Sequence, residues 1–183
     1  MDTYLLGQAG IEKQDGMAGR LLRGGHNIDP KVIEDALGAH PAVDLCAAVG
    51  APDAYAGELP VAFATLKPGA QVSAEALLTF TAERVDEAPA KPKRITILER
   101  MPVTHVGKIY KPELRTLATG AVVLGLIQQV LTPLQTPAAQ WPQVQAAGDA
   151  LVEVDARATP AATWAALKPL LDALPVMLVL HAP

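Results

Sequence analysis

Cysteine, aromatic residues and an excess of charge of one sign are all scarce in this 183-residue chain. The single cysteine, Cys46, cannot form an internal disulfide, which excludes a small secreted fold built on disulfides and favours a reducing compartment. Aromatic residues make up 4% of the chain and leave little surface for stacking on bases. The 15 basic and 19 acidic side chains give a net charge of -4, so we expect no nucleic-acid partner.

Long apolar runs are also missing from the sequence. The longest one, Ala121–Ile127, falls far short of the roughly 20 residues that a membrane-spanning helix needs. The first residues show no basic segment followed by an apolar one, so we expect no leader peptide. The sequence therefore predicts a cytoplasmic protein without a transmembrane segment.

Most motifs that mark metal and nucleotide sites are absent as well. The histidines, at positions 26, 40, 105 and 181, have no ligand spacing with one another or with Cys46, so we expect no metal site. The chain has no Gly-x-Ser-x-Gly, no Walker lysine loop and no glycine fingerprint of dinucleotide-binding folds. Candidate chemistry has to come from other segments.

Half of the residues are apolar, which is enough for one domain, or for one domain and a small second unit. Up to about residue 115 the patterns of strands and helices alternate. The expected elements are a corner at Gly24-Gly25 and Asn27, a helix over 30–38 capped by Asp29, strands over 43–50 and 59–67 joined by a loop, a helix from Ser73 to about Val85 with Ala76, Leu77 and Phe80 inward, a strand over 94–99, and a short basic helix within 102–115. This order predicts an α+β fold with a small central β-sheet flanked by helices.

The two ends of the chain have a different texture. Residues 1–18 are poorly defined, with a possible short strand at Tyr4–Leu6. Residues 117–134 have apolar helical spacing, and 136–145 resemble a linker. The last segment has the pattern of a compact βαβ unit, with a strand over 151–155, a helix over 160–174 and a strand over 176–181. We expect residues 116–183 to be an extension that docks on residues 19–115 or completes their sheet.

One loop carries a candidate catalytic group. It reads Pro102-Val-Thr-His-Val-Gly-Lys-Ile-Tyr-Lys111, so that Lys108 follows Gly107. A lysine beside a glycine in an irregular loop can reach an anion, because its ammonium group is a compact charge with three donors. Glycine also lets the backbone approach a ligand closely. Taken alone, the pair is better explained as part of a solvated surface turn.

Several segments in order around this loop resemble a known family. Arg23-Gly-Gly-His-Asn-Ile-Asp-Pro30 is followed by His40-Pro-Ala-Val43 and by Ala47-Ala-Val-Gly50 with Pro52-Asp53. Then come Gly57-Glu58-Leu-Pro60, Lys91-Pro-Lys93 and the 102–111 loop with Leu114-Arg115. Together these motifs resemble the C-terminal domain of adenylate-forming enzymes, which include acyl-CoA synthetases, luciferases and peptide-synthetase adenylation domains. The resemblance covers about residues 19–115. The residues of the Arg23–Pro30 motif are most similar to those of bacterial fatty-acyl-CoA synthetases.

The resemblance implies a two-step ligase reaction. A carboxylic acid attacks ATP to give an acyl-adenylate and pyrophosphate, and the thiol of CoA then displaces AMP, with the small C-terminal domain rotating between the steps. It implies that Lys108 enters the active site in the first step, and that Gly107 and Arg20 lie near the nucleotide. Mg²⁺ is expected with ATP, held by the large N-terminal AMP-binding domain.

The same resemblance implies a site for CoA. Gly24 and Gly25 would face the channel of the pantetheine chain in the second step, where missing side chains leave room. Lys91 and Lys93 could attract the phosphates of CoA, although solvated loop lysines are the simpler interpretation. Glu34, Asp53 and Glu58 have structural interpretations, as a surface residue, an Asx-type turn and a loop carboxylate.

Two departures from the family pattern leave alternatives open. The large N-terminal domain is not contained in these residues, so we expect the 183-residue chain alone to be inactive and that domain to be its partner. The acidic hinge residue expected ahead of the Gly24-Gly25 corner is missing, because Gly19-Arg20 runs directly into Leu21-Leu22-Arg23. The alternatives are a non-catalytic interaction module derived from this domain and a fragment of a peptide-synthetase-type adenylation domain. A homodimer is a further expected partner state.

Overall fold

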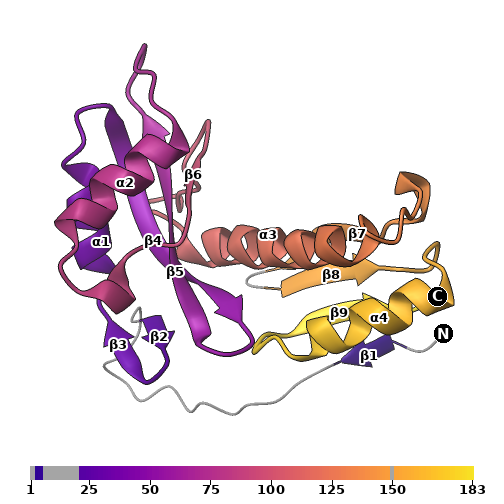
Figure 1. Ribbon diagram of the computed structural model, residues 1–183. Helices are drawn as coiled ribbons and strands as arrows, with labels where there is room; N and C mark the ends of the chain where they lie inside the picture. Colours follow the sequence, from indigo (N-terminus) through magenta and orange to yellow (C-terminus); the bar gives the residue numbers. More distant parts are fainter. Residues whose placement is uncertain (1–2, 6–20, 149–150) are drawn as a thin grey trace. The chain divides into compact units, whose positions relative to one another are not determined.

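The computed structural model describes residues 3–5, 21–148 and 151–183. The chain divides into two compact units, Glu12–Leu114 and Arg115–Pro183, and the second also contains the N-terminal strand β1 (Thr3–Leu5). Both units combine helices with a sheet, so the predicted α+β class is confirmed (Figure 1). Each unit is described below by itself.

The first unit contains a five-stranded sheet in the order β3-β2-β5-β4, and β6 lies outside this order and pairs with β5. All of its pairs are antiparallel except β5 and β6, which are parallel. The strands are β2 (Leu21–Arg23), β3 (His26–Ile28), β4 (Val43–Asp53), β5 (Gly57–Leu66) and β6 (Ile95–Ile97). The middle of β4 and of β5 is buried at consecutive positions, as expected of strands covered on both sides.

Two helices pack against this sheet, α1 (Pro30–Gly38) and α2 (Ala74–Arg84). Asp29 caps α1, where its side chain accepts from the N–H of Lys31, and Ser73 caps α2 by accepting from Ala76. Both helices share one hydrophobic core with the sheet. Its buried members include Ile33, Leu37, Ala48, Ala62, Ala64, Leu77, Val85 and Ile95.

The expected corner at Gly24-Gly25 is present, as the turn of a hairpin between β2 and β3. Two other expectations about this unit need correction. The loop expected over 51–58 is shorter, because β4 continues to Asp53 and β5 begins at Gly57, where a tight turn joins them. Ala76 is exposed, because the inward positions of α2 are Leu77 and Thr81, one turn apart.

The second unit has a sheet of its own, in the order β1-β9-β8-β7. The expected βαβ pattern is present: β8 (Leu151–Asp155) and β9 (Leu178–His181) are parallel, and α4 (Ala161–Asp172) connects them. The segment therefore does not complete the first sheet. The expected linker over 136–145 contains a 3-10 turn, η2 (Ala138–Gln140), and the start of β7 (Gln143–Gly148). The docking of this unit on the first one stays a prediction.

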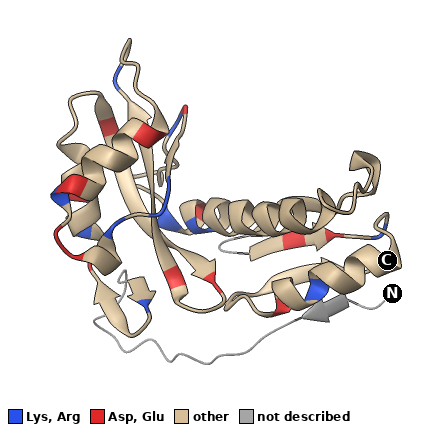
Figure 2. Ribbon diagram, viewed as in Figure 1, with Lys and Arg blue, Asp and Glu red and all other residues tan. Residues whose placement is uncertain are grey.

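The helix α3 (Lys111–Leu131) joins the two units in the chain, since its first turn belongs to the first unit. It is one helix where the sequence suggested two segments. Its length of 21 residues and an 18-residue window with a mean hydropathy of 1.4 make it long and apolar enough to cross a membrane, and Figure 2 shows no charge beyond its first turns. Val123, Ile127 and Leu131 are fully buried in the core of the second unit, and a core helix of a soluble protein meets the same test. The length of the uninterrupted apolar run gave too low an estimate of the apolar length of α3, because small residues and glutamines interrupt the run without ending the helix.

Candidate functional site

The loop that carries Lys108 is closed by its own hydrogen bonds. The N–H of Thr104 donates to the carbonyl of Lys108 at 2.7 Å, and the N–H of Gly107 donates back to Thr104 at 2.8 Å. The N–H of Lys108 also donates to the hydroxyl of Thr104 at 3.2 Å. Gly107 has a φ of +79°, a conformation that favours glycine. The sequence Thr104-x-x-Gly107-Lys108 therefore folds into a small, fixed turn.

Lys108 is exposed on this turn. No salt bridge to its ammonium group is formed by the residues that the structure describes. Around Gly107 the space is open, with no atom within 4 Å of the position that a Cβ would take. An ammonium group on a turn of fixed backbone, with open space beside it, can approach an anionic ligand without first breaking an ion pair.

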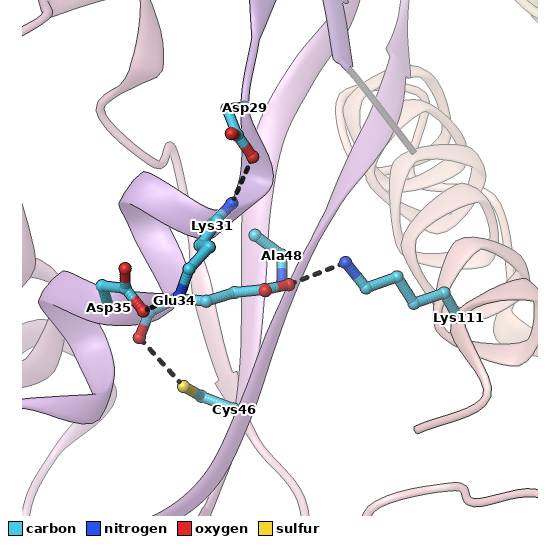
Figure 3. A network of polar contacts seen from close by, with 7 residues as sticks. All are labelled: Asp29, Lys31, Glu34, Asp35, Cys46, Ala48 and Lys111. Carbon is cyan, nitrogen blue, oxygen red and sulfur yellow. Dashed lines mark hydrogen bonds and ion pairs between the residues drawn. The ribbon is translucent and has the colours of Figure 1, made fainter. Parts of the chain in front are cut away.

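A second lysine, Lys111, is held at the end of the same loop (Figure 3). Its Nζ lies 2.8 Å from Oε1 of Glu34, on α1. The same oxygen accepts from the N–H of Ala48, on β4, at 2.9 Å. Cys46 donates its thiol hydrogen to the backbone carbonyl of Glu34 at 3.3 Å. Burial, with a smaller contribution from the charges of Glu34 and Asp35, raises the pKa of the Cys46 thiol to about 11.

The proposed CoA residues come together at another place in the first unit. Gly24 and Gly25 have φ values of +53° and +85°, as a two-residue hairpin turn requires. The N–H of Gly24 donates to the carbonyl of Ala56 at 2.9 Å, which ties this turn to the turn between β4 and β5.

The Gly24-Gly25 turn is also tied to the proline and lysine loop. Arg23 donates from Nη1 to the carbonyl of Pro89 at 2.6 Å, within the turn η1 (Ala88–Ala90). Lys91 and Lys93 follow directly, and Lys93 donates its N–H to the carbonyl of Pro60 at 2.8 Å. The side chain of Lys93 is exposed and that of Lys91 is half-buried. The two glycines and the two lysines therefore lie on neighbouring segments.

The carboxylates of Asp53 and Glu58 have structural partners. Asp53 accepts from the N–H groups of Tyr55, at 3.0 Å, and Ala56, at 2.8 Å, which is the Asx-type turn that the sequence suggested. Glu58 accepts from the N–H of Leu22 at 3.0 Å, across the strands. Its carboxylate lies over Gly50, where a Cβ would come within 2.5 Å of it. Glycine at position 50 therefore leaves the space that the carboxylate of Glu58 occupies.

Tyr55 is a candidate ligand-binding residue that was not predicted from the sequence. It is 99% exposed at the tip of the β4–β5 turn, directly before Ala56, which accepts from Gly24. The backbone of this turn is fixed by Asp53, so the ring is presented to solvent at low conformational cost. A signal for it exists in the sequence, because an aromatic residue in a polar turn has no core to enter.

The histidines have ordinary surroundings. His40 packs edge-on against Phe80, with ring centroids 4.7 Å apart, and Nε2 of His181 lies 2.7 Å from Glu153. His26 and His105 are exposed. Among the residues that the structure describes, no group of three His, Cys, Asp or Glu side chains could hold a metal ion. Arg20, the candidate nucleotide contact, lies outside the described residues.

The first unit of the chain is similar to part of several known proteins. Residues 32–108 match the family described as the AMP-binding enzyme C-terminal domain. The chain is similar to a marinolic acid–CoA ligase of Pseudoalteromonas sp. (strain SANK 73390), with 50% identity over 95 residues that cover 52% of this chain and 14% of that protein. It is also similar to a long-chain-fatty-acid–CoA ligase of Bacillus subtilis (strain 168), with 40% identity over 95 residues that cover 51% of this chain and 17% of that protein.

A solved structure extends the similarity to three dimensions. A fatty acyl CoA synthetase of Mycobacterium tuberculosis superimposes with a TM-score of 0.52 and 27% sequence identity, covering 57% of this chain and 20% of that one. The chain thus spans less than a fifth of the length of the two curated relatives above. The family match lies within the unit that carries the Gly24-Gly25 turn and the Lys108 loop.

Proposed function

Because residues 32–108 match the family described as the AMP-binding enzyme C-terminal domain, we propose that this chain serves as the C-terminal domain of an ATP-dependent acyl-CoA synthetase. The overall reaction would convert a carboxylic acid, ATP and CoA into acyl-CoA, AMP and pyrophosphate. The large N-terminal AMP-binding domain of such an enzyme would be its partner. The observation that carries the proposal is Lys108, exposed on a fixed turn without an ion-pair partner among the described residues.

Lys108 would act in the first step. The attacking carboxylate and the phosphates of ATP are both anions, and their repulsion opposes the approach of the carboxylate oxygen to the α-phosphorus. An ammonium group between them offsets this repulsion and stabilises the charge that moves onto the departing pyrophosphate. Gly107 would let the backbone come close to the nucleotide, and Arg20 would contact it.

The Gly24-Gly25 turn would act in the second step, at the channel for the pantetheine chain. Both glycines lack neighbours within 4 Å of a Cβ position, so the space beside the turn is open for a thin ligand. Lys91 and Lys93, on the neighbouring segment, would attract the CoA phosphates. Tyr55 is exposed on the turn that is hydrogen-bonded to Gly24, and its ring would offer an aromatic face to a ligand there.

Mg²⁺ is expected with ATP, but the described residues do not fit it, because no group of three potential ligands lies together. The N-terminal domain would hold the ion. We further propose a cytoplasmic location and leave a homodimer as an expectation to be tested by sedimentation.

The second candidate function is a non-catalytic interaction module. It is favoured by the missing acidic hinge residue, since no Asp or Glu stands between Gly19 and the Gly24-Gly25 turn. Without the hinge, the rotation between the two steps would lack its pivot.

The size of the native polypeptide separates the two candidates. An immunoblot of the source cells with an antibody against this chain would show a band far larger than 19.1 kDa if the catalytic partner domain is on the same polypeptide. That product, when purified, should release AMP only when acid, ATP and CoA are all present. A band at 19.1 kDa without this activity would favour the interaction module.

A further inference from the structure

Lys111 occupies a place where a lysine does not help its own helix. It is the first residue of α3, and the free N–H groups at a helix N-terminus carry partial positive charge that disfavours a basic side chain. Helix stability alone therefore gives no reason for a cation there. Glu34 supplies the compensating negative charge, although it lies 77 positions away in the sequence.

Glu34 is itself fixed in place. Its Oε1 accepts from the N–H of Ala48 as well as from Lys111, so the carboxylate cannot rotate freely (Figure 3). The side chains of Lys111 and Glu34 are 31% and 25% exposed, which shields the pair from much of the solvent. One carboxylate oxygen thus joins α1, β4 and the start of α3.

The two ends of the Lys108 loop are bonded to each other directly before Lys111 in the sequence. The N–H of Tyr110 donates to the carbonyl of Pro102 at 2.8 Å, and Val103 is bridged to Ile109. Met101, before the loop, is 3% exposed, and Lys111 follows the loop directly. The bonds inside the loop fix its shape, whereas Met101 and Lys111 decide how the loop is held on the domain.

From this arrangement we infer that Glu34 and Lys111 are positioning residues for Lys108. The ion pair holds the base of the Lys108 loop against α1 and β4, so that the ammonium group of Lys108 is presented from a fixed backbone. The inference rests on the proposed role of Lys108, because Lys111 and Glu34 would act only by positioning its ammonium group.

The test measures amide hydrogen exchange by NMR in the full 183-residue chain. Glu34→Gln keeps the size of the side chain and an acceptor for Ala48 but removes the charge that holds Lys111. Lys111→Met removes the other partner and leaves Glu34 bonded to Ala48. We expect both variants to raise the exchange rate of the Tyr110 amide on the order of tenfold, because the loop then opens from its base. Lys111→Arg, which can still pair with Glu34, should restore the original rate.

Asp35→Asn is the matched control. It removes an ion pair of similar length, Lys31 to Asp35 at 2.7 Å, from the same helix without touching the loop. This variant should leave the Tyr110 amide unchanged. The inference is overturned if Glu34→Gln and Lys111→Met leave that amide unchanged, or if they raise exchange equally throughout the core of the first unit, since a uniform rise would mark a general loss of stability.

Kinetics on the native full-length product keep this inference apart from the proposed function. Glu34→Gln should lower kcat of acid-dependent pyrophosphate exchange on the order of tenfold with little change in the KM for ATP, because aiming matters most at the transition state. If Lys108→Ala leaves this half-reaction intact, the proposed function fails, whatever the amide hydrogen-exchange rates show. If Lys108→Ala abolishes it while Glu34→Gln leaves kcat unchanged, only the positioning role fails.

Discussion

At the scale of a single residue, the proposed ligase chemistry depends on the ammonium group of Lys108. Lys108→Ala in the full-length product should reduce acid-dependent pyrophosphate exchange by roughly 100-fold or more, as expected when a group that stabilises transition-state charge is removed. Thioester formation from supplied acyl-adenylate and CoA should be retained, because the lysine acts before the adenylate exists. The two half-reactions are measured separately, by isotope exchange and by thioester assay.

A suitable control is Lys168→Ala. Lys168 pairs with Asp172 on α4 and carries the same charge in the other unit. This variant should behave as the unchanged enzyme in both half-reactions. Equal losses in both half-reactions for Lys108→Ala would contradict the assigned role, since they would point to a binding or folding defect.

Cys46 provides a test of the surroundings of Glu34. With its pKa raised to about 11 by burial, the thiol should react with iodoacetamide at pH 8 roughly 100-fold more slowly than in the unfolded chain, where the pKa is close to 9.0. The thiol of Cys46 stays protonated to a higher pH in the folded state than in the unfolded state. Stability should therefore fall as the pH rises from about 9 to about 11, and Cys46→Ala should remove that part of the decline. Alkylation as fast in the folded chain as in urea would show that the thiol is not protected.

At the scale of the elements, Gly50 on β4 and Glu58 on β5 form one packing unit with β2. Gly50→Ala would place a methyl group where the Glu58 carboxylate lies, and that flexible side chain would have to leave the N–H of Leu22. The expected cost is about 1 kcal/mol, the typical net contribution of an intramolecular hydrogen bond. Urea unfolding should show this loss.

The same unit predicts non-additivity. Glu58→Ala already removes the hydrogen bond to Leu22, so Gly50→Ala should cost much less in that background. Fully additive losses would mean that the alanine clashes with something other than Glu58.

How far the sequence predicted these elements depends on how local their signals are. Asp29 and Pro30 fix the start of α1 through contacts within three residues, and the predicted bounds 30–38 agree with the structure. The strands β2 and β3 are only three residues long each, and pairing with each other and with β5 stabilises them. No pattern of alternation is visible in so short a segment. Similarly, α3 was divided at residue 115 because its charges end there, although its helical spacing does not.

The candidate site was predictable to the same degree. The open, glycine-flanked position of Lys108 follows from its own loop, and so does the turn at Gly24-Gly25. The partner of Lys111 did not follow, because Glu34 is brought to it by the packing of α1 on β4. Likewise, the bond from Arg23 to Pro89 that joins two proposed CoA segments is a tertiary contact. The roles of Arg20, Gly107, Lys91 and Lys93 stay predictions.

At the scale of the whole molecule, the residues that the structure describes form two hydrophobic cores that share no residue. Both tryptophans, Trp141 and Trp164, belong to the second core or pack against it. Tryptophan fluorescence therefore reports on the second unit, and circular dichroism reports on both. In a single unfolding experiment the second unit can therefore be followed separately from the signal of the whole chain.

The last prediction uses this division. Leu171 on α4 is 1% exposed in the second core, and Leu171→Ala should lower the stability of that unit by about 2–5 kcal/mol through the cavity that it creates. The tryptophan transition in urea should move to lower concentration accordingly. An unchanged transition would contradict the assignment of Leu171 to a tightly packed core.

Leu37→Ala makes the same truncation in the core of the first unit, where Leu37 is fully buried. If residues 116–183 dock on the first unit, as the sequence led us to expect, destabilising that unit removes a surface on which the second one depends. The tryptophan transition should then shift as well, although both tryptophans lie in the other core. A shift seen by circular dichroism with an unmoved tryptophan transition would instead mean that the extension folds by itself, and the docking prediction would be wrong.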